Sequence, residues 1–412
     1  MEVKPGYKQT EVGVIPEDWY ARPLGDIGGV RMCKRVFKHQ TRKIGDVPFY
    51  KIGTFGDVPD AFISQELFDE FKTKYSFPRK GDVLISAAGT IGRTVVYDGA
   101  PAYFQDSNIV WIDSDPSKAT NEYLRHYYHV TKWSVSHGGT VARLYNDNLK
   151  TKIYVATPPL LEQRAIATAL SDADALLGGL NRLIAKKRDI KQATMQQLLT
   201  SQKRLPGFTG EWEVKRLGDV ATFYKGKGLP KSALSESSAE PCIHYGELFT
   251  RYPETIHEIF SRTDTSEAVF RSLTNDVLMP TSDVTPRGLA KASCVTVDGV
   301  ILGGDILVIR SDTNRVYGPF LSLIIRYEET QVLQLVTGST VYHLYGSDMK
   351  NFTFSIPSLP EQVAIAEVLT EMGAELAVLE QRWEKTRVLK QAMMQELLTG
   401  RTRLVSPEVA HA

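Results

Sequence analysis

Basic side chains cluster at similar places in the two halves of this chain. Residues 31–43 carry six lysines and arginines, one histidine and no acidic residue. Residues 72–80 interleave further basic residues with aromatic ones, and residues 224–231 add three lysines in the second half. Cationic loops bind phosphates, and counterion release makes that binding sensitive to salt. One such run is most often a solvated surface, but two runs in a chain with a net charge of +1 favour DNA.

Base reading needs arginine, asparagine, glutamine or serine side chains at the groove edge. Arg93, Arg143, Arg287 and Asn148 stand in glycine-rich or polar loops and are candidates, although each could equally form a surface ion pair. We therefore expect DNA contacts from a set of basic residues: Arg31, Lys34, Arg35, Lys38, Arg42, Lys43, Lys72, Lys74, Arg79, Arg93, Arg143, Lys225, Lys227, Lys231, Arg287 and Lys291.

Motifs that would make the chain itself a catalyst are missing. Thr157–Leu160 (TPPL) lacks the polar amide and the stacking aromatic of amino-methyltransferases, and Gly226–Ser232 has proline where a phosphate loop needs its second glycine. His126 and His129 could suit a metal, but without a neighbouring ligand cluster they are better explained as partly buried histidines. Glu213–Lys215 fits half of a nuclease motif, a triplet that chance produces often. We expect no catalytic, cofactor-binding or metal-binding residue here.

Composition places the chain among soluble globular proteins. Of its 412 residues 42% are hydrophobic and 24% charged, which suffices for two or more domains. Its three cysteines are far apart, which excludes a disulfide scaffold and fits a reducing cytosol. We see no leader-like apolar segment and no run of 18 apolar residues, so we expect a cytoplasmic protein that does not cross a membrane.

A long helical segment occurs twice, and it must position the basic regions. Residues 162–205 and 361–404 align at an offset of 199 with 21 of 44 positions identical. Apolar residues recur in alternating steps of four and three, the spacing of a coiled-coil seam. About 40 residues of helix span roughly 60 Å. The expected seam comprises Ile166, Leu170, Leu177, Leu180, Ile184 and Leu198 in the first copy, and Ile365, Leu369, Leu376, Leu379, Trp383 and Leu397 in the second.

Shorter repeated anchors show that whole halves are duplicated. Trp19–Asp26 matches Trp212–Asp219, and 81–84 matches 275–278. Gly138–Tyr145 matches Gly338–Tyr345, again in the same order. The segments between the anchors diverge, which suggests that the scaffold and the reading surface have separate tasks. The predicted divisions are 1–157, 158–203, 204–356, 357–401 and a tail of 402–412.

Mixed secondary structure is expected between the anchors, so we predict α+β domains. The predicted strands are 82–86, 94–97, 108–112 and 305–310, and the predicted short helices are 121–131 and 320–327. Each long helix could pack only on its own domain, or the two could pack on each other. Seams of equal length favour two similar domains joined by an antiparallel coiled coil with pseudo-two-fold symmetry.

Several segments together resemble a known family. The connector Arg204–Trp212 (RLPGFTGEW), the opening Tyr7–Trp19, and the helix starts Pro158–Gln163 and Pro357–Gln362 are similar to those of the DNA specificity subunit of type I restriction–modification systems. The first helix start departs from the pattern, since TPPLLEQ has no serine cap. The resemblance covers essentially the whole chain.

The resemblance implies a division of labour. Two target recognition domains would each read one half of a bipartite, asymmetric DNA sequence, and the helices would set the gap and dock modification subunits, two in number, with restriction subunits as further partners. It implies adenine methylation by those subunits, with S-adenosylmethionine, and with ATP and Mg²⁺ for restriction, held outside this chain. The alternatives are a stand-alone methyltransferase or nuclease with duplicated DNA-binding domains, and a coiled-coil scaffold that does not bind DNA.

Overall fold

The computed structural model describes residues 4–133, 143–265 and 269–406, and the chain divides into two compact units. The first unit contains residues 1–179 and 383–412, and the second contains residues 180–382. Helix α5 (Leu160–Leu199) and helix α10 (Leu359–Leu397) each begin in one unit and end in the other. Our division of the sequence into five segments stays a prediction. Both long helices begin two residues later and end four residues earlier than we expected.

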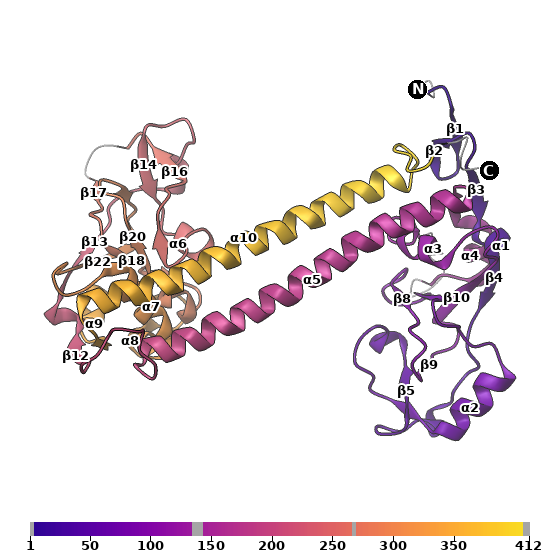
Figure 1. Ribbon diagram of the computed structural model, residues 1–412, viewed down its shortest axis with the longest axis horizontal. Coiled ribbons are helices and arrows are strands. Elements are labelled where there is room, and N and C mark those ends of the chain that lie inside the picture. The colour runs from indigo at the N-terminus through magenta and orange to yellow at the C-terminus, as the bar shows by residue number, and fades with distance from the viewer. Residues whose placement is uncertain (1–3, 134–142, 266–268, 407–412) are drawn as a thin grey trace. The chain divides into compact units, whose positions relative to one another are not determined.

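A four-stranded sheet forms the centre of the first unit (Figure 1). Its strand order is β4 (Gly28–Arg31), β10 (Ile109–Ser114), β7 (Val83–Ser86) and β8 (Thr94–Val96), with every neighbouring pair antiparallel. All four residues of β7 are buried, as expected for a strand that is covered on both faces. The predicted strands at 82–86, 94–97 and 108–112 are thereby confirmed.

Alternate residues of the central strands serve two separate cores. Val83 and Ile85 pack with helix α3 (Asn121–Tyr127), helix α4 (Asn146–Lys152) and the start of α5. The residue between them, Leu84, packs on the opposite face against a small sheet. That sheet has the order β6 (Phe62–Ile63), β5 (Val47–Tyr50), β9 (Tyr103–Phe104), and helix α2 (Gln65–Lys74) covers it. The remaining elements of the unit are helix α1 (Leu24–Ile27), the hairpin of β1 (Tyr7–Thr10) with β2 (Gly13–Pro16), and the strand pair of β3 (Tyr20–Pro23) with β11 (Tyr154–Thr157).

Helix α3 is shorter than the predicted helix 121–131. It ends at Tyr127, and the backbone N–H groups of His129 and Val130 donate to carbonyls three residues earlier. This tighter turn replaces a further helical turn.

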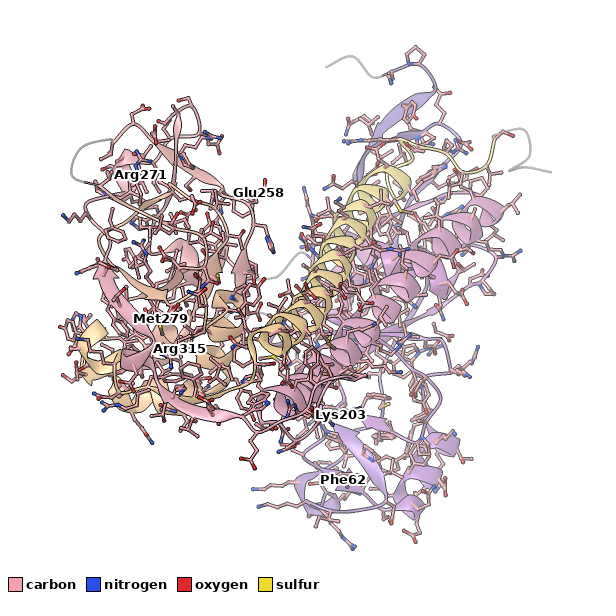
Figure 2. All side chains as sticks on the ribbon, turned by 60° about the vertical axis from the view of Figure 1, so that its left-hand side comes forward. Phe62, Lys203, Glu258, Arg271, Met279 and Arg315 are labelled. Carbon is pink, nitrogen blue, oxygen red and sulfur yellow. The ribbon has the colours of Figure 1, made fainter. Side chains whose placement is uncertain are left out.

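The second unit repeats this plan with a five-stranded sheet. Its order is β13 (Ala221–Lys225), β22 (Ile306–Ser311), β18 (Val277–Pro280), β20 (Ser293–Val295) and β15 (Thr255–Ile256). The predicted strand 305–310 and helix 320–327 are confirmed as β22 and α7 (Gly318–Tyr327). In Figure 2, Met279 of β18 lies inside the unit, whereas Arg271 lies at its outer surface.

A second sheet covers the face of the five-stranded sheet that carries Leu278 and Val308, whereas several short elements belong to the core on the other face. The order of the sheet is β16 (Ser261–Thr263), β14 (Glu240–Ile243), β21 (Ile301–Leu302) and β17 (Phe270–Arg271). The remaining elements are the pair β12 (Glu213–Arg216) with β25 (Thr353–Ile356), the sheet β19 (Ser282–Asp283), β24 (Tyr342–His343), β23 (Thr337–Gly338), and helices α6 (Glu247–Thr250), α8 (Glu329–Leu335) and α9 (Gly346–Met349).

Strand pairing makes the two units equivalent. Strands β4, β10 and β7 pair as β13, β22 and β18 do, and the parallel pair β5 with β9 corresponds to β14 with β21. The anchors 81–84 and 275–278 have a backbone reason to match. Gly81 (φ 95°) and Asn275 (φ 81°) both adopt the left-handed conformation at the turn into the central strand, which glycine and asparagine tolerate best.

Helices α5 and α10 pack together in antiparallel orientation, so the predicted fold class is confirmed. In the second unit Leu198 shares a core with Ile365 and Leu369, and Lys187 pairs with Glu375 at 2.7 Å. In the first unit the sequence order is likewise reversed. There Ile166 and Leu170 of α5 share a core with Leu397 near the end of α10.

The two helices pack on each other and also on the domains. The predicted seam positions are the shielded ones of each helix: Ile166, Leu170, Leu180, Ile184, Leu198, Ile365, Leu369, Leu376 and Leu397 are buried, and Leu177, Leu379 and Trp383 are half-buried. Ile166 and Leu170 belong to the core of the first unit as well, because α5 starts against its sheet. Each long helix therefore packs both on a domain and on the other long helix.

Candidate nucleic-acid interface

Five of the predicted DNA-binding residues meet in one groove of the first unit. The groove measures about 740 Å³ and lies beside the turn at residues 105–108. Six cationic side chains and two carboxylates line it: Arg35, Lys38, Arg42, Lys43, Lys51 and Arg143, with Asp60 and Asp106. The excess of positive charge suits a polyanion such as the DNA backbone.

Local structure explains how 31–43 reaches this groove. A short 3₁₀ helix at Lys38–Gln40 turns the chain, and the backbone N–H of Phe37 donates to Gln40 Oε1 at 2.9 Å. Arg42 then adds to the small sheet through a backbone bridge with Phe62. The basic run is therefore folded onto the edge of the sheet.

Hydrogen bonds join the turn to two of the arginines. Arg35 Nε donates to Asp106 Oδ2 at 2.9 Å, and Ser107 Oγ donates to the same carboxylate oxygen at 3.1 Å. On the other side, Arg143 donates through a terminal guanidinium nitrogen to the Ser107 carbonyl at 3.1 Å. The two cations are thus held on either side of one turn.

Ser107 itself has strained backbone geometry. Its φ is 59°, in the left-handed region, which costs a serine about 1–2 kcal/mol. Such strain persists where the surrounding contacts enforce it, and it clusters at functional sites. Here it points the carbonyl at Arg143, which supports a functional role for this turn.

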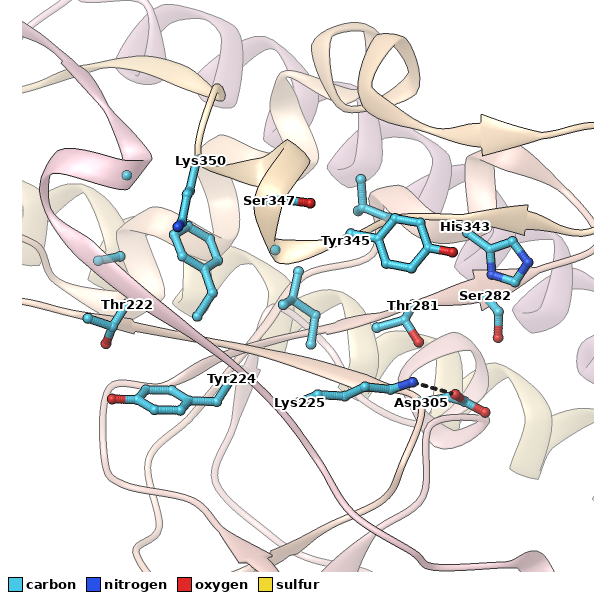
Figure 3. Close-up of a pocket in the computed structure, with 16 residues that line it drawn as sticks. Thr222, Tyr224, Lys225, Thr281, Ser282, Asp305, His343, Tyr345, Ser347 and Lys350 are labelled. Atoms are coloured by element: carbon cyan, nitrogen blue, oxygen red, sulfur yellow. Dashed lines mark ion pairs between the residues drawn. The ribbon is translucent and has the colours of Figure 1, made fainter.

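A second groove lies in the second unit (Figure 3). It measures about 930 Å³ and is bordered by β13, the start of β22 and α9. Lys225 and Asp305 lie near its middle with 3.5 Å between Nζ and Oδ1, and Tyr345 and His343 lie along one side. The imidazole and phenol rings stack at 6.0 Å between centroids.

The two grooves meet the sheets at one equivalent residue. Arg143 forms a backbone bridge with Ala88, two residues after β7 ends, and His343 pairs with Ser282, two residues after β18 ends. In both units the next residue is a buried leucine whose N–H donates to the carbonyl just after the central strand. The anchor that we aligned at 138–145 ends here, although residues 138–142 lie outside the described part of the chain.

The other predicted residues of the first unit lie away from the groove lining. Lys72 stacks over Phe68 and Phe77, and Lys74 pairs with Glu70 on α2 at 3.0 Å. The rest occupy separate places: Lys34 lies over the Tyr75 ring, Arg31 pairs with Asp113, Arg93 donates to the Gly56 carbonyl, and Arg79 is exposed beside Asp82.

Of the second unit's predicted residues, only Lys225 lines the groove. Arg287 pairs with Glu329 at 3.0 Å, and Lys227, Lys231 and Lys291 are exposed outside the lining. Sequence reasoning did not select His343, Tyr345 and Lys350, nor Gln105–Asn108 in the first unit. The repeated anchors ending at Tyr145 and Tyr345 carried the signal that could have found the first two.

The histidine and the glutamate that we considered as metal or nuclease residues make contacts within the protein. His126 is buried and lies 3.0 Å from Ser171 Oγ, where burial, with Arg125 nearby, lowers its pKa to about 4. Glu213 forms an ion pair with Lys215 on β12. Within residues 4–133, 143–265 and 269–406 no cluster of three potential metal ligands occurs. No helix in those same ranges is both long and apolar enough to cross a membrane.

Comparison with known families agrees with the duplicated plan. The family described as "Type I restriction modification DNA specificity domain" matches residues 16–187 and again residues 209–385. The two matches together cover most of the chain and one copy falls in each half.

Two curated relatives show how far the likeness extends. A putative type I restriction enzyme specificity subunit from Haemophilus influenzae is 61% identical over 153 residues, which are 37% of this chain and 40% of that protein. The putative MjaX specificity subunit from Methanocaldococcus jannaschii is 25% identical, with 97% of each chain covered. The chain thus spans less than half of the first relative and nearly all of the second.

Solved structures share the fold. The S subunit of a type I restriction–modification system from M. genitalium matches with a TM-score of 0.63 and 14% identity, covering 96% of this chain and 98% of that one. A second match comes from a structural study of assembly of the type I system, with a TM-score of 0.50 and 16% identity over 94% of this chain and 99% of that one.

Proposed function

The chain belongs to the type I restriction–modification DNA specificity family, and from that membership we propose that each of its two recognition domains reads one half of a bipartite, asymmetric DNA target. It is a specificity subunit and not itself the catalyst. The resemblance in the sequence is thereby confirmed at the level of the family.

One observation carries the proposal. Each of the two equivalent domains has a groove with cationic side chains in its lining, and the two grooves share an equivalent position, which is Arg143 in the first unit and His343 in the second. Two non-identical readers suit a target whose two halves differ. The first groove carries more arginine, and the second carries tyrosine, histidine and lysine, so the two halves should have different letters.

Partner subunits supply the chemistry in this proposal. Modification subunits, two in number, would methylate adenine with S-adenosylmethionine, and restriction subunits would use ATP and Mg²⁺. Helix α5 offers them an apolar surface. Leu176, Leu183 and Ile190 recur every seven residues and are 43%, 40% and 42% exposed. Large apolar side chains repeated on an exposed helix face are typical of an interaction surface.

The gap between the half-sites is assigned to the helices. Helix α5 continues without interruption for 40 residues and α10 for 39. Their seam holds the register through buried leucines and through ion pairs such as Arg188 with Glu380 at 2.5 Å. Helix length would therefore set the number of base pairs between the letters that the two domains read.

Methylation mapping tests the proposal in cells. Adenine methylation at one bipartite target should appear with the intact chain and disappear without it. Purified complex should bind that duplex with strong salt dependence. No dependence of any methylated motif on this chain would refute the proposal, salt-independent binding would favour a scaffold, and S-adenosylmethionine binding by the isolated chain would favour a stand-alone methyltransferase.

Substitutions in the first groove test whether the DNA binds there. Lys38→Glu with Arg42→Glu should weaken duplex binding and lower the slope of log affinity against log salt by about one for each phosphate that is no longer neutralised. Lys74→Glu is the control, because Lys74 pairs with Glu70 on α2 outside the groove lining. An equal weakening in the control would place the DNA elsewhere.

A further inference from the structure

We propose that Arg143 and His343 are equivalent specificity-determining residues, each selecting one base pair at the same step of its half-site. The inference rests on the proposed function and adds to it the residues that read. The first observation is where the two residues lie. Each pairs with the second residue after the central strand of its unit, β7 or β18, and each lines the groove of its unit.

The frame around this position is fixed while the side chain varies. Leu144 and Leu344, which follow directly, are buried and donate their N–H groups to Ala87 and Thr281 at 2.8 Å and 3.0 Å. The backbone is therefore placed equally in both units. A fixed backbone with a different side chain at one position is what allows two readers to select different letters.

Arg143 is held for bidentate recognition. One terminal nitrogen donates to the Ser107 carbonyl, which fixes the guanidinium plane through a strained turn. Arginine has five donors, so the remaining N–H groups can meet the two acceptors of guanine, O6 and N7. We assign a G·C pair to this position of the first half-site.

His343 offers a different set of groups. Its ring stacks on Tyr345 with an interplanar angle of 17° and lies beside Ser282 in Figure 3. The stacking restrains the imidazole, which can make one hydrogen bond to a base edge. The second half-site should therefore be read less strictly at this step than the first.

Lysines of each groove serve a different purpose. Lys38 and Lys43 in the first groove and Lys350 in the second present point charges that suit phosphates. Removing a lysine that binds phosphate weakens all sequences alike, whereas removing a side chain that reads a base changes the preferred letter. This difference separates reading from positioning in an experiment.

The test maps the methylated motifs in cells that carry the complete complex with a single substitution in this chain. Arg143→Ala should relax one position in one half of the motif, with discrimination there falling about tenfold or more, and His343→Ala should relax one position in the other half. Arg143→Gln should move the preference from guanine toward adenine, because glutamine pairs with N6 and N7 of adenine. A new preference cannot arise from poor folding.

Matched controls lie outside the grooves. Arg401→Ala in the first unit and the exposed His257→Ala in the second should leave every letter unchanged. If Arg143→Ala and His343→Ala lower methylation without changing any letter, or if the controls change the same letters, the inference is overturned while the proposed function stands. If no motif depends on the intact chain, the proposed function itself has failed.

Discussion

Arg403 and Glu162 stand 241 positions apart in sequence, and Nε of the arginine donates to the carboxylate at 2.6 Å. The Glu162 side chain is fully buried and also accepts from Trp19 Nε1 at 3.1 Å. The arginine–glutamate pair recurs in the second unit, where Arg204 donates to the buried Glu361 and lies over Trp212. These repeated glutamates are therefore the structural centre of each junction between helix and domain.

Removing either arginine should destabilise its unit strongly. Arg403→Ala leaves the Glu162 charge buried without its cation, which costs about 3–5 kcal/mol, and Arg204→Ala should do the same to Glu361. Urea unfolding of the purified chain measures both. Arg401→Ala is the control, since its 67% exposed side chain lies 3.8 Å from Glu396 and should change stability by less than about 1 kcal/mol. Equal effects from Arg401 and Arg403 would contradict the assignment.

Apolar packing, rather than the ion pairs, should hold the two helices together. Leu180 and Leu376 are buried seam residues that lie outside both domain cores, so Leu180→Ala and Leu376→Ala should each cost about 2–5 kcal/mol. Arg188→Ala breaks an ion pair whose side chains are 63% and 47% exposed, and should cost less than about 1 kcal/mol. Denaturant midpoints decide between the two effects, and a larger destabilisation for Arg188 would reverse this ranking.

Acid should weaken the first unit through His126. Burial, with Arg125 and Lys390 close by, lowers the pKa of His126 from 6.5 to about 4, although Asp174 acts in the opposite direction. Between these values the unfolded chain binds the proton and the folded chain does not, so stability falls as pH drops from about 6.5 toward 4. The expected decrease in the free energy of unfolding is on the order of 2 kcal/mol.

A His126→Gln variant should flatten that dependence. Its unfolding free energy, measured from pH 7 to pH 4.5, is compared with that of an exposed-histidine variant, His39→Gln. Burial raises the pKa of Asp174 but Lys390 and Arg125 lower it by more, so its contribution disappears only below about 3.8. Burial also lowers the pKa of His129, so His126→Gln should remove only the part of the dependence that comes from His126. The same acid destabilisation in His126→Gln and in the unaltered chain would disprove the role of this histidine.

Lengthening the helices should change the tolerated gap and keep the letters. Seven residues inserted after Lys186, with seven matching residues after Glu375, preserve the seam because the heptad repeat is kept. Seven residues add about 10 Å of helix, which corresponds to about three base pairs of duplex. Motif mapping would read the result, and altered letters with an unaltered gap would contradict the assignment of the gap to the helices.

Periodic features of the fold were predictable from the sequence, and most of the groove was not. The steps of four and three gave the seam down to Leu198 and Leu397, because coiled-coil packing depends on local spacing. Charge density placed Arg35 and Lys43 in the groove but also suggested Lys72 and Lys74, which fold onto aromatic rings and onto Glu70. Local composition cannot tell a folded-back lysine from an outward one.

Residues that reach the groove by tertiary pairing were the hardest to foresee. Asp106 and Ser107 join it through hydrogen bonds to Arg35 and Arg143, which are 71 and 36 positions away. Lys350 reaches the second groove from the end of α9, with no basic run around it. Only the strand pairing that places 143 beside 88 and 343 beside 282 shows that these regions meet.

The return of the final helix to the first core has a consequence for synthesis. Leu397 and Leu398 complete that core, and the Tyr7 hydroxyl donates to the Gly400 carbonyl at 3.0 Å. A growing polypeptide therefore cannot finish its first unit until residue 400 has been translated, whereas the second unit, a continuous stretch of 180–382, has every segment it needs earlier. The part made first matures last, and a prematurely terminated product would leave the ribosome with an open apolar surface in its oldest part.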